Sequence, residues 1–344
     1  MTKIYLSYEM LFTMLRIKGL ISRGCAASWM AYRLERRRKS YRPLRKVGYM
    51  VYSMSDDLDK AIKAAAKASP MDTNKAYAGF FFHRLLCRVF SDPNSSFLLK
   101  GGQSMLARTV DARATRDIDL LSEGVDLEQA VEELKRLASI DMGDFVMFTF
   151  SQVKSIKDED EYRAGVCVVF HVRLGNKRLQ DVSVDLVADE IPQEGFDTLT
   201  PADRIEVRGI PTCDYRIYTV ESALADKFCG IVERHDGRSS SRQKDLIDVL
   251  IYALSSEIDG AALSRRLQVE QTARKMPRSD RFEIPAEWRE SGEARFRKLC
   301  GQVPLVKGAN GLDDAVKIAS KLFNPVLDGS AAGKKWDPAS GAWI

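Results

Sequence analysis

The stretch of sequence that decides the fold runs from Phe97 to Leu121 and reads FLLKGGQSMLARTVDARATRDIDLL. Phe97–Lys100 is a short apolar run that predicts a buried strand, and the diglycine Gly101–Gly102 ends it by letting the backbone turn sharply. Residues 103–110 follow with a helical pattern, and residues 117–121 predict a second short strand. The order strand, diglycine, helix, strand predicts a compact α/β unit.

Both ends of this stretch carry groups suited to binding a phosphorylated ligand. Ser104 lies at the start of the expected helix, where free N–H groups and the helix dipole favour a phosphate. Asp117 and Asp119 are two residues apart on a strand, so both carboxylates point to one face while Ile118 and Leu120 point to the core. Neighbouring carboxylates repel unless a cation lies between them, and Mg²⁺ prefers such oxygen ligands together with substrate phosphates. The alternative is a solvated strand edge beside a simple turn, but the upstream strand, diglycine and serine favour a site.

The two common phosphate-binding fingerprints, GxxxxGK[ST] and GxGxxG, do not occur in the chain. Lys100-Gly101-Gly102-Gln103-Ser104 followed by Arg116-Asp117-Ile118-Asp119-Leu120 instead resembles the first motif of the nucleotidyltransferases related to DNA polymerase β, most closely the AbiEii/AbiGii toxin-type branch. The resemblance covers about residues 75–255, and this chain differs in having Gln103 between the glycines and the serine. The resemblance implies that nucleotide is bound by Lys100, Gly101, Gly102, Ser104 and Arg116.

The same resemblance implies a third carboxylate on a neighbouring strand. Residues 182–187 alternate between apolar and polar, which places Asp185 on the polar face. Asp181 at the start of that strand and Asp189 at its end are alternatives. The implied ligands of Mg²⁺ or Mn²⁺ are Asp117, Asp119 and Asp185.

Two further segments resemble motifs of this branch. Residues 218–227 (YTVESALADK) resemble the second motif, a helix whose lysine, here Lys227, places a point charge near a triphosphate. Lys227 thereby joins the three aspartates as an implied catalytic residue, although a solvated helix lysine is the simpler alternative. Residues 238–248 (RSSSRQKDLID) resemble an R.KD..D motif. The resemblance implies that its charged side chains Lys244, Asp245 and Asp248 line the nucleotide cleft. The alternative is that they form structural ion pairs with Lys227 or Arg234.

Composition sets limits on the class of protein. Of 344 residues, 45% are hydrophobic and 29% charged, which is enough apolar surface for a folded core. There is no uncharged apolar run of about 18 residues, so we expect no membrane segment. Six cysteines lie far apart without a CxxC pair, and only three histidines occur, which argues against zinc ribbons and disulfide scaffolds. This pattern is typical of a reducing, cytoplasmic environment.

The positive charge lies at one end of the chain. Residues 1–50 hold 12 lysines and arginines against two acids, whereas the whole chain has a net charge of +5. We therefore divide the sequence into a basic N-terminal extension (1–53), a nucleotidyltransferase core (54–218) and a helical C-terminal domain (219–344). The extension has three interpretations: a nucleic-acid-binding arm, a targeting segment, or a misassigned start with Met50 or Met54 as the first residue.

The expected fold class is α+β, a small mixed β-sheet core flanked by helices with a helical C-terminal half. Three strands are expected within residues 144–188. His83 lies in an apolar helical run and is expected in the core, and Trp288 is expected to anchor packing. The helices expected outside the motif region are 54–68, 73–90, 126–138, 220–235, 242–256, 259–270, 285–300 and 311–324.

The resemblance implies a metal-dependent enzyme that transfers NMP from an NTP to RNA, with the 3′ end of tRNA as acceptor. It also implies the toxin of a toxin–antitoxin pair, with a cognate antitoxin as partner. A metal-dependent nuclease and a non-catalytic nucleotide-binding module are the alternatives. An RNA acceptor would need a positive track, and the candidates in the helical half are Arg265, Arg266, Arg274, Lys275, Arg278, Arg295, Arg297 and Lys298.

Overall fold

The structure is a computed structural model that describes residues 51–109, 112, 115, 117–155, 164–189, 193–235, 237–306 and 311–344. By its internal contacts the chain divides into two units, residues 1–45 and 46–344, and the described residues all belong to the second. The predictions for the basic segment 1–50 and for Arg116 lie outside the described residues. The division at residue 218 stays a prediction.

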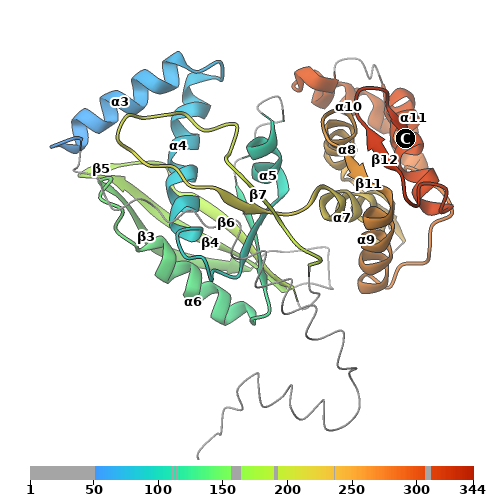
Figure 1. The fold of residues 1–344 in the computed structure, drawn as a ribbon, viewed down its shortest axis with the longest axis horizontal. Helices are drawn as coiled ribbons and strands as arrows, with labels where there is room; N and C mark the ends of the chain where they lie inside the picture. The colour runs from blue at the N-terminus through green and yellow to red at the C-terminus, as the bar shows by residue number, and fades with distance from the viewer. Residues whose placement is uncertain are drawn as a thin grey trace, which may run out of the picture. The chain divides into compact units, whose positions relative to one another are not determined.

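An eight-stranded mixed sheet forms the centre of the fold (Figure 1), with the strands ordered β3-β4-β6-β2-β1-β8-β7 and β5 paired to β4. The β2–β6 and β1–β8 pairs are parallel and the other pairs are antiparallel. The strands are β1 (Phe97–Lys100), β2 (Ile118–Glu123), β3 (Val146–Ser155), β4 (Ala164–Leu174), β5 (Lys177–Arg178), β6 (Val182–Asp189), β7 (Asp197–Leu199) and β8 (Tyr215–Ile217). This mixed sheet with its flanking helices confirms the predicted α+β class.

Three N-terminal helices cover one face of the sheet: α3 (Ser55–Ala68), α4 (Thr73–Val89) and α6 (Leu127–Ala138). Asp72 and Asp126 cap α4 and α6 by accepting hydrogen bonds from backbone amides three residues on, which satisfies otherwise unpaired N–H groups. The apolar stripes of these helices share one core with the even-numbered residues of β2 and β6. His83 is buried in this layer at 6% exposure, which confirms the sequence prediction.

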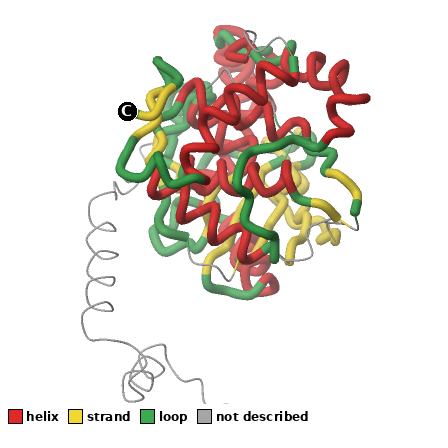
Figure 2. Tube along the Cα trace, turned by 90° about the vertical axis from the view of Figure 1, so that its right-hand side faces the viewer, coloured by secondary structure: helices red, strands yellow, loops and turns green. Residues whose placement is uncertain are grey.

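The helical half packs around a second core. Its helices are α7 (Val220–Val232), α8 (Gln243–Ser255), α9 (Gly260–Ala273), α10 (Glu293–Cys300) and α11 (Leu312–Leu327), with a π-helical turn at Trp288–Gly292 and a 3₁₀ turn at Pro304–Val306. Short strands β9 (Arg234–His235) and β10 (Arg238–Ser239) form a hairpin, and β11 (Ile258–Asp259), β12 (Lys335–Asp337) and β13 (Ala342–Trp343) form a small sheet, seen in yellow beside the C-terminus in Figure 2. Trp288 is buried and donates its indole N–H to the Ser240 carbonyl, so it is the packing anchor that was predicted.

The second core reaches the other face of the sheet, because Leu98, Leu121 and Val187 belong to the same apolar cluster as α7 and α8. Between the two layers lies α5 (Gly101–Arg108), which begins directly after β1. It begins at Gly101 rather than at Gln103 as expected, so the diglycine forms the first turn of the helix. The polar edge where β1, β2 and β6 meet this helix is the position of the predicted site.

Candidate active site

Strand register brings two of the predicted carboxylates side by side. Asp119 of β2 pairs directly with Asp185 of β6, and residues that pair in this way project from the same face of a sheet. The neighbouring residues Ile118 and Val184 point to the opposite face, where both are fully buried. The alternation inferred from the sequence is therefore the one in the structure.

Register also distinguishes between the candidate third carboxylates. Asp181 lies directly before β6. Its carboxylate accepts a hydrogen bond from Arg178 at 2.8 Å and lies 3.1 Å from His171 Nδ1, so it is already paired at the start of the strand. The backbone of Asp189 pairs with Glu123 rather than with either motif aspartate. Of the three alternatives, Asp185 alone pairs with a motif aspartate among the described residues.

Asp117 was expected inside the strand, but it lies in a bend one residue before β2 begins. The physical reason is that β1 ends at Lys100, the partner of Asp119, so β2 has no β1 partner beyond that point. The Asp117 residue is exposed, and its charge contributes to raising the pKa of the Cys167 thiol.

Asp119 has an unusual electrostatic environment. Burial raises its pKa and so does the nearby charge of Asp185, whereas Lys100, Lys227 and Lys244 act in the opposite direction, and the resulting pKa is about 6. A carboxyl group in this state is poised to lose its proton when a cation binds. The three lysines also concentrate positive charge around the paired aspartates.

Gly101 shapes the bend around Asp119. Its φ is +65°, a left-handed conformation that favours glycine, and a Cβ at this position would lie 1.9 Å from Oδ2 of Asp119. A Cβ on Gly102 would lie 2.9 Å from Cβ of Thr115. The diglycine is therefore required for the close approach of β1, α5 and the motif aspartate, in agreement with the role assigned to it from the sequence.

Two polar side chains of α5 point inward. Ser104 is 1% exposed and donates its hydroxyl to the Gly101 carbonyl at 2.8 Å, while the Tyr252 hydroxyl also contacts it. Gln103 is equally buried and donates to Asp203. The phosphate-binding groups that α5 offers are therefore its unpaired first-turn amides, and a direct contact from the Ser104 hydroxyl stays a prediction.

Lys227 is not a solvated helix residue. Its ammonium group bonds Asp245 at 3.0 Å and Asp248 at 2.8 Å, and all three side chains are buried. Burial alone would lower the lysine pKa, but the two carboxylates outweigh it and hold that pKa above its usual value. Asp245 and Asp248 therefore form the ion pairs with Lys227 that the alternative interpretation expected. Lys244 is exposed, and Arg234 lies 3.9 Å from Glu287 rather than beside these aspartates.

Cys167 is a site residue that sequence reasoning missed. It pairs with Asp185 in the β4–β6 ladder, and its thiol bonds that carboxylate. Burial and the Asp185 contact raise the pKa of the thiol to about 11, so it stays protonated and donates. The signal was present in the alternation of residues 164–172, which places Cys167 on the polar face, but its partner depends on strand register.

The acidic side chains of this edge are the candidate metal ligands. Over the described residues, no group of three or more His, Cys, Asp or Glu side chains is close enough to hold a metal ion as it stands. The predicted three-aspartate site stays a prediction, and the structure places two of its members, Asp119 and Asp185, side by side. Mg²⁺ is commonly held by one or two carboxylates plus substrate phosphates, and a carboxylate pair with one raised pKa fits that mode of binding.

Comparison with known proteins adds to this geometry. A profile of the family described as "Nucleotidyl transferase AbiEii toxin, Type IV TA system" matches residues 84–317, which include every motif residue named above. The chain belongs to the AbiEii nucleotidyl transferase toxin family. The resemblance inferred from the sequence is confirmed, and membership of a toxin–antitoxin family implies a cognate antitoxin as partner.

Solved structures similar to this AbiEii-family chain include JHP933 from Helicobacter pylori, at 14% identity and a TM-score of 0.40, covering 74% of this chain and 95% of that one. A second Helicobacter pylori protein, described as a candidate nucleotidyltransferase, matches with 14% identity and a TM-score of 0.40 over 74% of this chain and 97% of its own. No curated protein matches the chain. Across the helices that the structure describes, none has the length and apolar character needed to cross a bilayer.

The RNA track expected on this AbiEii-family chain needs a correction. Arg266 and Arg274 are only 2% and 7% exposed. Arg266 bonds Glu270 within α9, whereas Arg274, directly after α9, bonds Glu233 at the end of α7 and so joins the two helices. The helical spacing looked like a charged surface, but these arginines face inward because buried acids on both helices compensate their charge. The exposed cations that remain from the predicted track are Arg265, Lys275, Arg278, Arg295, Arg297 and Lys298.

Proposed function

We propose that this chain is a metal-dependent nucleotidyltransferase that transfers NMP from an NTP to an RNA acceptor. The observation that carries the proposal is the direct pairing of Asp119 with Asp185 beside the Gly101 bend. Family membership supports the reaction class. The metal, the nucleotide and the acceptor belong to the proposal.

Asp119 and Asp185 would hold Mg²⁺ or Mn²⁺, with Asp117 drawn in from its exposed position. When bound, the cation would supply positive charge to offset the negative charge of the triphosphate and would lower the pKa of the acceptor hydroxyl. Cys167 would keep Asp185 oriented by donating its thiol proton to that carboxylate. The Gly101 bend would fix Asp119, because its backbone packs directly against Oδ2.

The triphosphate would lie against the first turn of α5. Amides of Gly101 and the residues after it have no partner within the helix, and backbone N–H groups at a helix start favour phosphate oxygens. Lys100 lies beside the bend as the register partner of Asp119, and Lys244 is exposed and acts on the same aspartate. These positive charges would offset those of the triphosphate where the carboxylates alone would repel it.

Lys227 would supply a fixed positive charge. Two buried aspartates hold it in one place, and its charge acts on Asp119. In the reaction, an acceptor oxygen forms a bond to the α-phosphorus while the bond to the bridging oxygen breaks, and that electron pair leaves with pyrophosphate. The acceptor proton passes to solvent. A lysine already in place needs no reorganisation as charge develops on the leaving group.

The acceptor is proposed to be RNA, with the tRNA 3′ end as the specific target, and the reaction is placed in the cytoplasm. Support comes from exposed cations in the helical half. An open groove of about 990 Å³ there is lined by Lys317, Lys321, Lys334 and the indole of Trp343, a combination of charge and aromatic surface that suits a polyanion with bases. The neutralising partner in the toxin–antitoxin pair would be the cognate antitoxin.

The test incubates the full chain with each labelled NTP, Mg²⁺ and total cellular RNA, followed by gel separation. NTP-dependent lengthening of RNA is expected, and it should be lost in Asp119→Asn and Asp185→Asn. Asp126→Asn is the matched control, because it makes the same chemical change at an exposed helix cap that asparagine can also fill. Shortening of RNA with Mg²⁺ alone would assign a nuclease, and NTP binding without any change in RNA would assign a binding module.

A further inference from the structure

The helix that carries the diglycine bend, α5, is too short to be stable without contacts to the rest of the protein. It is eight residues long, begins with two glycines, and has no side-chain cap at Lys100. Isolated helices of this length are unstable, and each glycine in a helix costs about 1 kcal/mol relative to alanine. The location of the Gly101 amide relative to Asp119 must therefore be set by contacts outside α5.

Several of those contacts come from β7 and the segments around it. The Gln103 amide donates to Asp203 Oδ2 at 2.9 Å, and one residue earlier the Ala202 N–H donates to the Ala107 carbonyl at 2.8 Å. Arg108 at the end of α5 bonds Asp197 and the Tyr218 carbonyl. The Gln103 bond is the contact nearest the phosphate-facing turn, and both of its side chains are buried, at 2% and 8% exposure.

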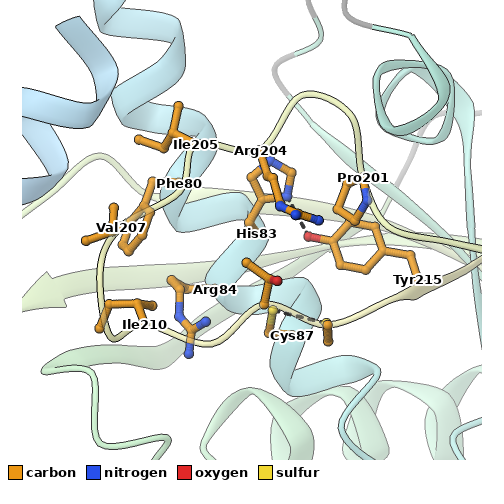
Figure 3. A pocket seen from close by; sticks show the side chains of 12 residues that line it. Phe80, His83, Arg84, Cys87, Pro201, Arg204, Ile205, Val207, Ile210 and Tyr215 are labelled. Carbon is orange, nitrogen blue, oxygen red and sulfur yellow. Dashed lines mark hydrogen bonds between the residues drawn. The ribbon is translucent and has the colours of Figure 1, made fainter. Parts of the chain in front are cut away.

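The other carboxylate oxygen of Asp203 faces His83. His83 of α4 places Nε2 at 3.5 Å from Asp203 Oδ1, and its Nδ1 lies 2.5 Å from the Tyr215 hydroxyl. Figure 3 shows His83 and Tyr215 pointing toward each other among the residues that line a small cavity. The cavity volume is about 20 Å³, large enough for a single water. Burial raises the pKa of Tyr215 and lowers that of His83, so the hydroxyl donates to Nδ1 and the neutral ring directs Nε2–H at Asp203.

We propose that Gln103 and Asp203 are positioning residues of the nucleotide site, whose hydrogen bond fixes α5 so that the amides of the Gly101 bend meet the triphosphate. This inference rests on the proposed function, and it assigns a role to Gln103, the residue at which this chain differs from the first motif, and to Asp203, which lies outside every motif described above. Neither side chain would touch substrate. A buried hydrogen-bonded pair at this position fixes the orientation of α5 rather than adding stability. An apolar pair of similar volume would pack there without the cost of removing polar groups from water.

The test is an exchange of the two chemical groups. Gln103→Glu sets two carboxyl groups against each other, and we expect the NTP KM to rise about tenfold or more while kcat changes less. Gln103→Glu combined with Asp203→Asn restores a donor and an acceptor with reversed polarity, and most of the loss should be recovered. Asp203→Asn alone retains an oxygen that can accept from Gln103, so its effect should be smaller than that of Gln103→Glu. Gln129→Glu, the same change on an exposed helix position, is the matched control.

A second readout does not depend on catalysis. Amide hydrogen exchange in a peptide covering residues 97–109 should accelerate in Gln103→Glu and return toward wild type in the exchanged pair, measured without nucleotide. An unchanged KM and unchanged exchange in Gln103→Glu, or a pair no better than the single variant, would overturn the inference. If exchange follows the expected pattern but the wild-type chain transfers no nucleotide, the anchoring stands and the proposed function fails.

Discussion

A Cβ on Gly101 would lie 1.9 Å from Oδ2 of Asp119, so the backbone at the start of α5 and the central acid of the site are in direct contact. No side chain fits between them, and the φ of +65° at Gly101 independently favours glycine. The bend is thus shaped around the carboxylate. Any displacement of one moves the other, which couples the phosphate-facing turn to the acid that would hold the metal.

Gly101→Ala should therefore abolish transfer while leaving the fold in place. The added methyl group must push away either Asp119 or α5, and we expect kcat/KM to fall by about 100-fold or more, with about 1–2 kcal/mol of lost stability from the left-handed backbone. Gly124→Ala is the control, since Gly124 has a similar φ of +74° but open space around it. The assignment is wrong if both alanine variants lose activity equally at the same folded fraction.

Replacement of Lys227 tests whether its charge both stabilises the fold, by compensating two buried aspartates, and supports nucleotide transfer. Lys227→Met leaves Asp245 and Asp248 buried without their cation, which should cost about 3–5 kcal/mol in the free energy of unfolding. Adding Asp248→Asn removes one uncompensated charge and should recover part of that stability. Transfer should stay lost in the double variant, because the charge near the leaving group is still missing. Chemical denaturation and transfer rates of both variants check this, and recovery of activity together with stability would assign Lys227 a structural role alone.

Local patterns were sufficient to predict much of the site. The placement of Asp119 and Asp185 on polar faces follows from alternation with fully buried neighbours such as Ile118 and Val184, and a period of two is a property of any strand. The helix beginning near residue 55 and the one after Asp126 were likewise predicted, since acidic first turns and caps act within a few residues.

Features that depend on tertiary pairing could not be predicted. Strand order decides that Cys167 and Asp119 flank Asp185, and the sequence of β4 does not contain that order. Arg266 and Arg274 were predicted to lie on the surface, but both are buried beside acids. A helix whose charged residues pair with buried acids can have the same composition as a helix whose charged residues face solvent. The Gln103–Asp203 bond joins residues 100 positions apart, so no local pattern indicates it.

The buried Arg88–Asp144 pair should be a major determinant of stability in the sheet half. Arg88 bonds both oxygens of Asp144 and the carbonyls of Ile140 and Val146, with 1% of each charged side chain exposed. Arg88→Met would leave Asp144 with fewer donors in a buried site, and we expect a loss of about 3–5 kcal/mol. Arg136→Met, which removes an exposed surface pair, should cost less than about 1 kcal/mol. Urea denaturation distinguishes the two, and equal losses would contradict this account.

Asp59 predicts a defined pH dependence of stability. Partial burial raises its pKa, but hydrogen bonds from Lys63, Tyr77 and Lys177 outweigh this and hold it at about 2, against an unperturbed value of 3.8. Because the folded-state pKa is depressed, the stabilisation is fully present above about pH 4 and is lost as the pH falls toward about 2. We expect Asp59→Asn to be less stable by about 1 kcal/mol near neutrality, after allowance for solvent screening. The difference from wild type should shrink between about pH 4 and pH 3, and a constant difference across that range would contradict the assignment.

Cys87 and Cys213 should form a disulfide under mild oxidation. Their sulfur atoms lie 3.0 Å apart, and the hydrogen bond from Cys213 lowers the pKa of Cys87 to about 7, so part of it is thiolate at neutral pH. With hydrogen peroxide, the Cys87 thiolate takes one oxygen to give a sulfenic acid and hydroxide. Attack by Cys213 then forms the S–S bond and releases water.

That bond would tie α4 to the segment carrying Asp203, closing a long loop, and we expect the free energy of unfolding to rise by up to about 5 kcal/mol. Peptide mapping by mass spectrometry should show the crosslink and the loss of two hydrogens. Cys213→Ser should remove the crosslink and leave Cys87 singly oxidised. Oxidation that pairs Cys87 with another cysteine, or a crosslink that lowers stability, would show that the two thiols are not held in the arrangement described.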